Sequence, residues 1–127
     1  MIKLDLQSRT PLYLQMEQQL IDLILLGQLH ENDQLPSVRN FARDLGINPN
    51  TIQKAYQDLE NRGIIYSAAG RGNFVASPSA AGDLKRRECM QTLDGLLGDA
   101  RRAGVSREEV HAAVDAAYDK PKEGDAQ

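Results

Sequence analysis

The chain of 127 residues has few aromatic residues and no long apolar segment. It contains no Trp, two Phe and four Tyr, so its core must be built mainly from Leu, Ile, Val and Ala. The most apolar run, residues 20–26, is short and contains Asp22, which excludes a membrane-spanning helix there. The first residues lack the apolar core of a signal peptide. We therefore expect a cytoplasmic protein that makes no contact with a membrane.

Reactive and metal-binding residues are also scarce. Cys89 is the single cysteine, which excludes a disulfide within the chain and suits a reducing compartment. A small apolar residue on a helix is one interpretation of Cys89; an intermolecular disulfide and a redox sensor stay open. His30 and His111 are isolated, and the sequence has no metal-ligand spacing and no phosphate-binding loop. The sequence therefore predicts no enzyme, no cofactor and no metal site.

Two helices are predicted before residue 47. Thr10 followed by Pro11 predicts a helix start, with the threonine as cap and the proline as first helical residue, and the apolar spacing continues to Gly27. Ser37 predicts the cap of a second, shorter helix, whose apolar residues recur at helical spacing until Gly46. A glycine at this place tolerates the left-handed backbone conformation that ends many helices.

A third helix and a hairpin follow. Asn48 and Pro49 predict the cap and the first residue of the third helix, which Gly63 ends. Two β-prone runs, residues 64–67 and 73–76, then flank a loop that contains glycines. This arrangement predicts a two-stranded β-hairpin.

The remainder of the chain is helical in pattern. Residues 77–79 have the sequence Ser-Pro-Ser and predict a linker. Two helical patterns share residues 80–119, and the second starts with a capping box of Ser106 and Glu109. Because a short connection joins them, they predict an αα-hairpin. Residues 120–127 have no apolar periodicity and predict a flexible tail.

The order of these elements is that of a winged helix-turn-helix. In that fold the second and third helices form the DNA-reading pair and the hairpin forms the wing. We therefore predict a mainly α fold with a small β-hairpin: a winged helix-turn-helix DNA-binding domain over residues 1–76, followed by the linker and a two-helix C-terminal hairpin.

The third helix has one apolar and one polar face. If Ile52, Ala55 and Leu59 point into the core, the opposite face is rich in amides and has a single lysine. Its members are Asn50, Gln53, Lys54, Gln57 and Asn61. Amide side chains can bond adenine through two hydrogen bonds in the major groove. The alternative is a solvated face, for which mixed Glu and Lys are expected.

Contacts to phosphate are predicted from other elements. Ser37 and Arg39 lie at the start of the second helix, where free amides favour an anion. Arg39 would contact a phosphate or a base, or be a plain surface arginine. The Thr51 hydroxyl would bind phosphate or serve the first turn of its own helix.

The hairpin loop contains Gly70, Arg71 and Gly72. The glycines permit a close approach of the backbone, and an arginine at a loop tip can enter a minor groove. An incidental arginine on a flexible tip is the alternative.

The predicted DNA-binding domain has few positively charged residues. The net charge of -3 argues weakly against a nucleic-acid binder, since binding depends on where charges lie rather than on their sum. Residues 1–78 hold seven Lys and Arg against eight Asp and Glu. Few cations predict modest DNA binding by one copy, and favour a dimer on two half-sites.

The chain resembles the GntR family of bacterial transcription regulators over roughly residues 9–76. The segments that carry the resemblance are Pro11–Tyr13, Leu35–Arg39, Leu45–Ile52, Leu59–Gly63 and Gly70–Val75. Most members join this domain to a large ligand-binding domain, whereas only two short helices remain here. That organisation is similar to the small YtrA-like branch, which implies that residues 80–119 form a homodimer. The predicted interface residues are Leu93, Leu96, Leu97, Val110, Val114 and Tyr118.

The resemblance also implies which residues contact double-stranded DNA. They are Arg39, Asn50, Thr51, Gln53 and the wing residues Gly70, Arg71 and Gly72. Many members have arginine at the positions that Pro49 and Gln53 occupy here, so the preferred bases must differ.

The function predicted on these grounds is that of a sequence-specific DNA-binding transcriptional regulator. We expect a homodimer that represses its own operon from a near-palindromic operator. A winged-helix protein–protein adaptor is the alternative. No residue pattern identifies a small-molecule effector, although a cavity between subunits stays open.

Overall fold

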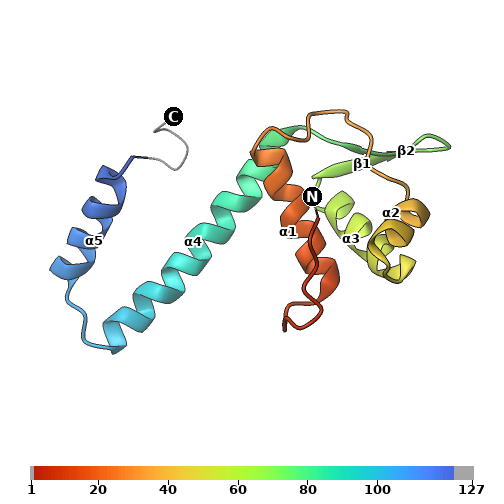
Figure 1. Cartoon of the computed structure of the whole chain (residues 1–127). Coiled ribbons are helices and arrows are strands. Elements are labelled where there is room, and N and C mark those ends of the chain that lie inside the picture. The colour runs from red at the N-terminus through yellow and green to blue at the C-terminus, as the bar shows by residue number, and fades with distance from the viewer. Residues whose placement is uncertain (1, 122–127) are drawn as a thin grey trace. The chain divides into compact units, whose positions relative to one another are not determined.

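The computed structural model describes residues 2–121 of the chain. Its elements are α1 (Leu12–Leu25), α2 (Val38–Leu45), α3 (Pro49–Asn61), β1 (Ile65–Ala68), β2 (Gly72–Val75), α4 (Pro78–Arg102) and α5 (Arg107–Asp119) (Figure 1). The chain forms two compact units, one through Arg86 and one from Arg87 onward. The fold is mainly helical with one small antiparallel hairpin, as predicted.

The first unit has one apolar core, to which α1, α2, α3 and the hairpin contribute. Met16 of α1 and Ile52 and Leu59 of α3 are fully buried. Phe41 of α2 and Val75 of β2 complete the same cluster. Burial of each such side chain contributes about 1.5–3 kcal/mol, which fixes the α3 surface that remains in solvent.

Local capping sets where α2 and α3 begin, as the sequence predicts. Ser37 Oγ accepts a hydrogen bond from the Asn40 amide at 3.1 Å, and Asn48 Oδ1 accepts one from the Asn50 amide at 2.8 Å. Between the two helices Gly46 has a φ of 69°, the left-handed conformation that glycine permits. The turn between the helices is therefore encoded by adjacent residues.

The start of α1 differs from the prediction. Pro11, with ψ of 147°, is the N-cap and not the first helical residue, and no side chain caps the helix. Thr10 is not the cap; its carbonyl oxygen instead accepts a hydrogen bond from Gln15 Nε2 at 2.8 Å. The prediction of a threonine cap was therefore wrong. The hydrogen bond between the segment before α1 and the helix comes from the Gln15 side chain, one turn into the helix.

The wing contains a backbone pairing beyond its two strands. In the hairpin, Ile65 pairs with Val75 and Ala68 with Gly72. The connection between α1 and α2 lies along the other edge of β2, where the Leu35 amide donates to the Asn73 carbonyl at 2.8 Å. Figure 1 shows this connection running beside the hairpin. The wing is thus joined to the polypeptide that leads into α2.

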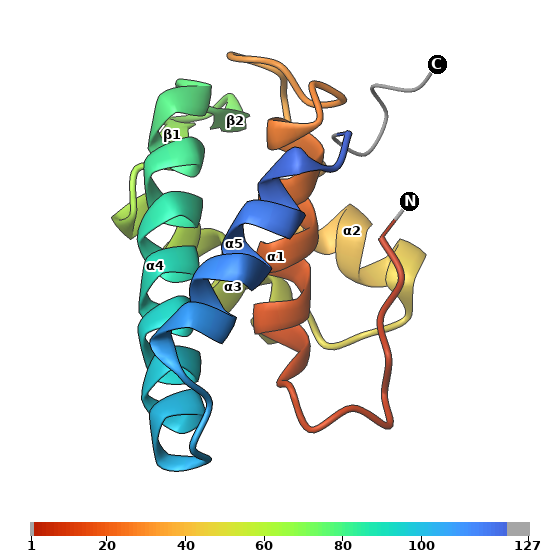
Figure 2. The same cartoon turned by 90° about the vertical axis from the view of Figure 1, so that its left-hand side faces the viewer.

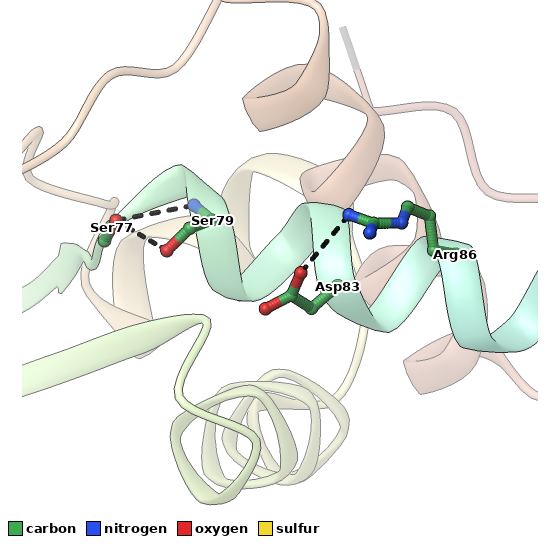
Figure 3. Close-up of polar contacts among 4 residues, drawn as sticks. All are labelled: Ser77, Ser79, Asp83 and Arg86. Atoms are coloured by element: carbon green, nitrogen blue, oxygen red, sulfur yellow. Dashed lines mark hydrogen bonds and ion pairs between the residues drawn. The ribbon is translucent and has the colours of Figure 1, made fainter.

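Helix α4 begins inside the segment that was predicted as a linker. Pro78 is its first residue, a position where the missing amide of proline costs nothing. Figure 3 shows Ser77 Oγ beside the Ser79 hydroxyl, at 3.0 Å, and facing its amide, at 3.4 Å. One turn later Asp83 and Arg86 form an exposed ion pair at 3.6 Å. Residues 77–79 are therefore a helix start rather than an irregular linker, while the proposed limits of the domains stay a prediction.

The second unit comprises the rest of α4 and α5. Helix α5 runs back from the end of α4 after a short turn (Figure 2). The predicted capping box is present: Ser106 Oγ accepts from the Glu109 amide, and the Glu109 carboxylate accepts from the Ser106 amide. Of the predicted flexible tail, residues 122–127 lie outside the described part of the chain.

Candidate nucleic-acid interface

The polar face of α3 is open to solvent along the whole helix. All five of its members are exposed: Asn50, Gln53, Lys54, Gln57 and Asn61. On the opposite face Ile52, Ala55 and Leu59 have no exposed surface. Gln57 Nε2 donates to Asn61 Oδ1 at 3.2 Å, which orients two of the amides relative to one another. These five side chains offer donors and acceptors, and none of them is a carboxylate.

Tyr56 fixes α3 relative to the start of α2. Its side chain is buried, and its hydroxyl donates to the Pro36 carbonyl oxygen at 2.7 Å. Burial raises the pKa of the Tyr56 phenol, so the group stays a neutral donor. Pro36 directly precedes Ser37, the α2 cap, so this bond spans the two helices of the helix-turn-helix.

Lys54 is directed toward α1. Its ammonium lies 4.0 Å from the centre of the Tyr13 ring, a cation–π contact. The two side chains border a surface hollow of about 390 Å³ where the first turn of α1 meets the first turn of α3. Its lining residues are Pro11, Leu12, Tyr13, Asn50, Thr51 and Lys54. The structure therefore brings three predicted contact residues together with the start of α1, and holds the lysine to one side of the helix.

The start of α2 presents one exposed cation. Ser37 serves as the helix cap, and Arg39 in the first turn is exposed. Arg43, one turn later, donates to Asn40 Oδ1 at 3.0 Å. Arg39 thus lies on the surface of the helix-turn-helix, and its contact with DNA remains a prediction.

The wing tip is a tight turn that exposes Arg71. The Arg71 amide donates to the Ala68 carbonyl at 2.9 Å, and the flanking Gly70 and Gly72 have φ of 74° and 119°. These conformations strain any residue with a side chain. The two glycines are therefore required by the turn itself, which explains them without a DNA contact.

Two residues near these surfaces were not predicted to take part. Tyr13 lies under Lys54, and Gln34 donates from its Nε2 to the Arg71 carbonyl at 2.9 Å. Both act across the fold, 41 and 37 residues from their partners in the sequence. No local pattern could reveal these pairs, although Tyr13 belongs to a segment that carried the family resemblance.

The predicted interface residues of the second unit are largely uncovered. Leu96 is 60% and Tyr118 86% exposed, whereas Val110 is half-buried. The remaining members, Leu93, Leu97 and Val114, are 41–46% exposed. One copy of the chain therefore leaves an apolar surface on α4 and α5.

Residues 12–75 match the family described as "Bacterial regulatory proteins, gntR family". The chain belongs to the GntR family. It is 40% identical over 113 residues to the HTH-type transcriptional repressor YtrA of Bacillus subtilis, and the match covers 87% of each chain. This GntR relative confirms the resemblance to the family and to its YtrA-like branch.

Two solved structures are similar to the GntR-family chain. The crystal structure of a transcriptional regulator from Oenococcus oeni is 28% identical, with a TM-score of 0.79, and covers 93% of this chain and 99% of that one. The AraR DNA-binding domain in complex with an operator is 28% identical, with a TM-score of 0.54, over 59% of this chain and 96% of that one. The first likeness extends through the C-terminal helices and confirms the predicted fold.

As a GntR-family member the chain is a transcriptional regulator with a DNA-binding domain. Its relatives are named as transcriptional regulators and repressors, a non-enzymatic role, in agreement with the prediction that it is not an enzyme. Within residues 2–121 no helix is both long and apolar enough to cross a membrane. The same residues contain no group of three His, Cys, Asp or Glu side chains arranged to hold a metal ion.

Proposed function

We propose that the protein represses transcription as a homodimer that binds a near-palindromic operator in double-stranded DNA. The observation that carries the proposal is the α3 face, on which exposed amides lie opposite a fully buried apolar stripe. In a helix-turn-helix this face enters the major groove. The solved complex of the AraR DNA-binding domain with an operator supports operator binding by this fold.

The α3 side chains divide between base and backbone contacts in this proposal. Asn50, Gln53 and Gln57 face the groove, where each good bidentate pair with adenine discriminates by about 1–3 kcal/mol. Lys54, held over Tyr13 at the side of the helix, would contact a phosphate rather than a base edge. Thr51 borders the same hollow and would bind the same phosphate group.

The other contacts flank the recognition helix. Arg39 at the start of α2, beside the Ser37 cap, binds the backbone of the same groove. Arg71, between Gly70 and Gly72, reaches the adjacent minor groove. Backbone contacts position the domain without carrying sequence information, so Arg39 sets affinity and register.

A dimer accounts for two features of the chain. The proposal places three exposed cations against DNA, Arg39, Lys54 and Arg71, so one copy gains few phosphate contacts. The apolar residues of α4 and α5 are exposed in one copy and would be covered in a pair. Two copies then present two α3 helices to successive major grooves.

Repression follows from occupancy: a dimer on its operator blocks transcription there. We propose that it acts in the cytoplasm on its own operon. The name of its Bacillus subtilis relative, the transcriptional repressor YtrA, supports repression. A winged-helix adaptor remains the second candidate, but an exposed amide face without large apolar residues does not favour a protein partner.

DNA binding by the purified protein tests the proposal. Fluorescence anisotropy with the region upstream of its own gene, at several salt concentrations, should show saturable binding that competitor DNA of unrelated sequence does not displace. Selection from a random duplex library should then show that Gln53→Ala alters base preference, while Arg39→Ala weakens binding to all sequences. Gln28→Ala, at an exposed glutamine after α1, is the matched control and should bind like the wild type. An adaptor would bind every sequence equally or none.

A further inference from the structure

Gln34 lies in the connection between α1 and α2 and contacts the tip of the wing. Its Nε2 donates to the Arg71 carbonyl oxygen at 2.9 Å. Its backbone is also bridged to Phe74 of β2 in antiparallel fashion. The side chain is therefore held at its base by the edge of the hairpin and at its end by the turn that carries Arg71.

Gly72 leaves the space that the Gln34 amide occupies. A Cβ built on Gly72 would lie 2.8 Å from Gln34 Nε2, closer than real Cβ atoms approach another atom. The φ of 119° at Gly72 independently disfavours a side chain. The glycine and the glutamine thus fit one another at the point where the hairpin turns.

The wing has little other support at this point. Its strands are four residues each, and a two-stranded hairpin of this length is marginally stable by itself. Arg71, in the turn at residues 69–71, is proposed to enter the minor groove. Among the contacts described for residues 2–121, the Gln34 hydrogen bond is the one that reaches Arg71 from outside the hairpin. A loop that is already ordered loses less conformational entropy when it binds.

We infer that Gln34 is a positioning residue: it holds the wing tip, and with it the Arg71 side chain, in the conformation that enters the minor groove of the operator. This inference rests on the proposed function. Gln34 itself need not touch DNA, since its amide acts on the backbone of Arg71. Because it precedes Pro36 and Ser37 in the same segment, the wing and the start of α2 are held by one stretch of chain.

A double-mutant cycle tests the inference, with operator affinity measured by anisotropy for the wild type, Gln34→Ala, Arg71→Ala and the double variant. Gln34→Ala should weaken binding about 2- to 10-fold, the range expected for disordering a pre-organised contact. The double variant should bind no more weakly than Arg71→Ala alone, because Gln34 acts through Arg71. Gln34→Glu keeps the size but replaces the donor with a carboxylate, so it should bind at least as weakly as Gln34→Ala, because a negative charge beside the DNA also lowers affinity.

Gln28→Ala is the control within the same connection and should bind like the wild type. Equal melting temperatures of the wild type and Gln34→Ala would exclude a general loss of stability. Losses at Gln34 and Arg71 that add independently, or a Gln34→Ala variant that binds like the wild type, would overturn the inference and leave the proposed function intact. A wild-type protein without sequence-selective binding would overturn both.

Discussion

The Tyr56 phenol shows how one side chain couples stability to the geometry of the DNA-reading pair. Its hydroxyl joins α3 to Pro36, and its ring packs in the core beside Phe41, with ring centres 6.4 Å apart. Phenylalanine would retain the packing and lose the hydrogen bond. Tyr56→Phe should therefore lower the free energy of unfolding by about 0.5–1.5 kcal/mol, measured by urea denaturation.

The same substitution should change how stability depends on pH. Burial raises the pKa of the Tyr56 phenol above its ordinary value near 10, so the folded state holds this proton more tightly than the unfolded state. The stabilisation that comes from the protonated Tyr56 phenol is present below pH 10 and is lost as the pH rises above 10. As the pH rises above about 10, the wild type should lose stability faster than Tyr56→Phe; parallel curves would contradict this.

Lys54 illustrates a residue whose location changes its expected role. Lys54→Met should reduce the slope of log affinity against log salt by about one, the value for a single phosphate contact, and leave base preference unchanged. Tyr13→Phe keeps an aromatic ring under the ammonium and should bind like the wild type, whereas Tyr13→Leu should lose part of the Lys54 contribution. A changed base preference in Lys54→Met would show that the lysine contacts bases.

At the scale of elements, the N-terminal segment is attached to α1 by two glutamines one helical turn apart. Gln19 accepts from the Lys3 amide at 2.8 Å and donates to its carbonyl at 2.6 Å. Gln15 makes the same pair of bonds to the backbone of Asp5, at 2.8 and 3.0 Å. Each amide side chain thus serves as the partner that a neighbouring strand would supply.

This attachment predicts a local effect on dynamics. Gln19→Ala should accelerate hydrogen exchange of the Lys3 amide at least several-fold, because exchange there requires only local opening. The Asp5 amide, still bonded to Gln15, should change less. Gln18→Ala, at the exposed adjacent position, is the control. Equal exchange at Lys3 in all three proteins would contradict the attachment.

The elements also show which parts of the fold could be predicted from the sequence. The caps Ser37 and Asn48 and the turn glycine Gly46 act on neighbouring residues, so their effect could be predicted from the local pattern. The pairing of residues 32–35 with β2 depends on chain segments far apart in sequence, and period and propensity do not encode it. The same holds for Gln34 with Arg71, so the wing loop was predicted but the side chain that contacts it was not.

At the scale of the whole molecule, folding leaves the polar face of α3 and the apolar surface of α4 and α5 in solvent. The first unit buries its own apolar residues, whereas most large exposed apolar side chains lie from Met90 onward. A domain with few cations gains affinity when a second copy adds its contacts at a fixed spacing. Operator affinity should therefore depend on α4 and α5, although no residue of these helices is proposed to touch DNA.

Leu96→Glu tests this dependence, because it places a carboxylate on the apolar side of α4. In a dimer, the substitution removes about 1.5–3 kcal/mol of stabilisation per chain that burial of the leucine would contribute. It also places a charge in the interface, which costs further free energy. The dimer dissociation constant should therefore rise more than tenfold. Gln91→Glu adds the same charge to the opposite side of the helix and should leave the dimer intact. Sedimentation equilibrium measures both.

The DNA affinity of Leu96→Glu should fall with the dimer, whereas binding to a single half-site at high protein concentration should persist. The first unit contains its own core, so the melting temperature of that unit should not change with Leu96→Glu. If Leu96→Glu sediments like the wild type, the contact between copies lies on another surface. If it becomes monomeric yet binds the full operator as tightly as Gln91→Glu, one α3 helix with its wing suffices, and the charge argument for a dimer is wrong.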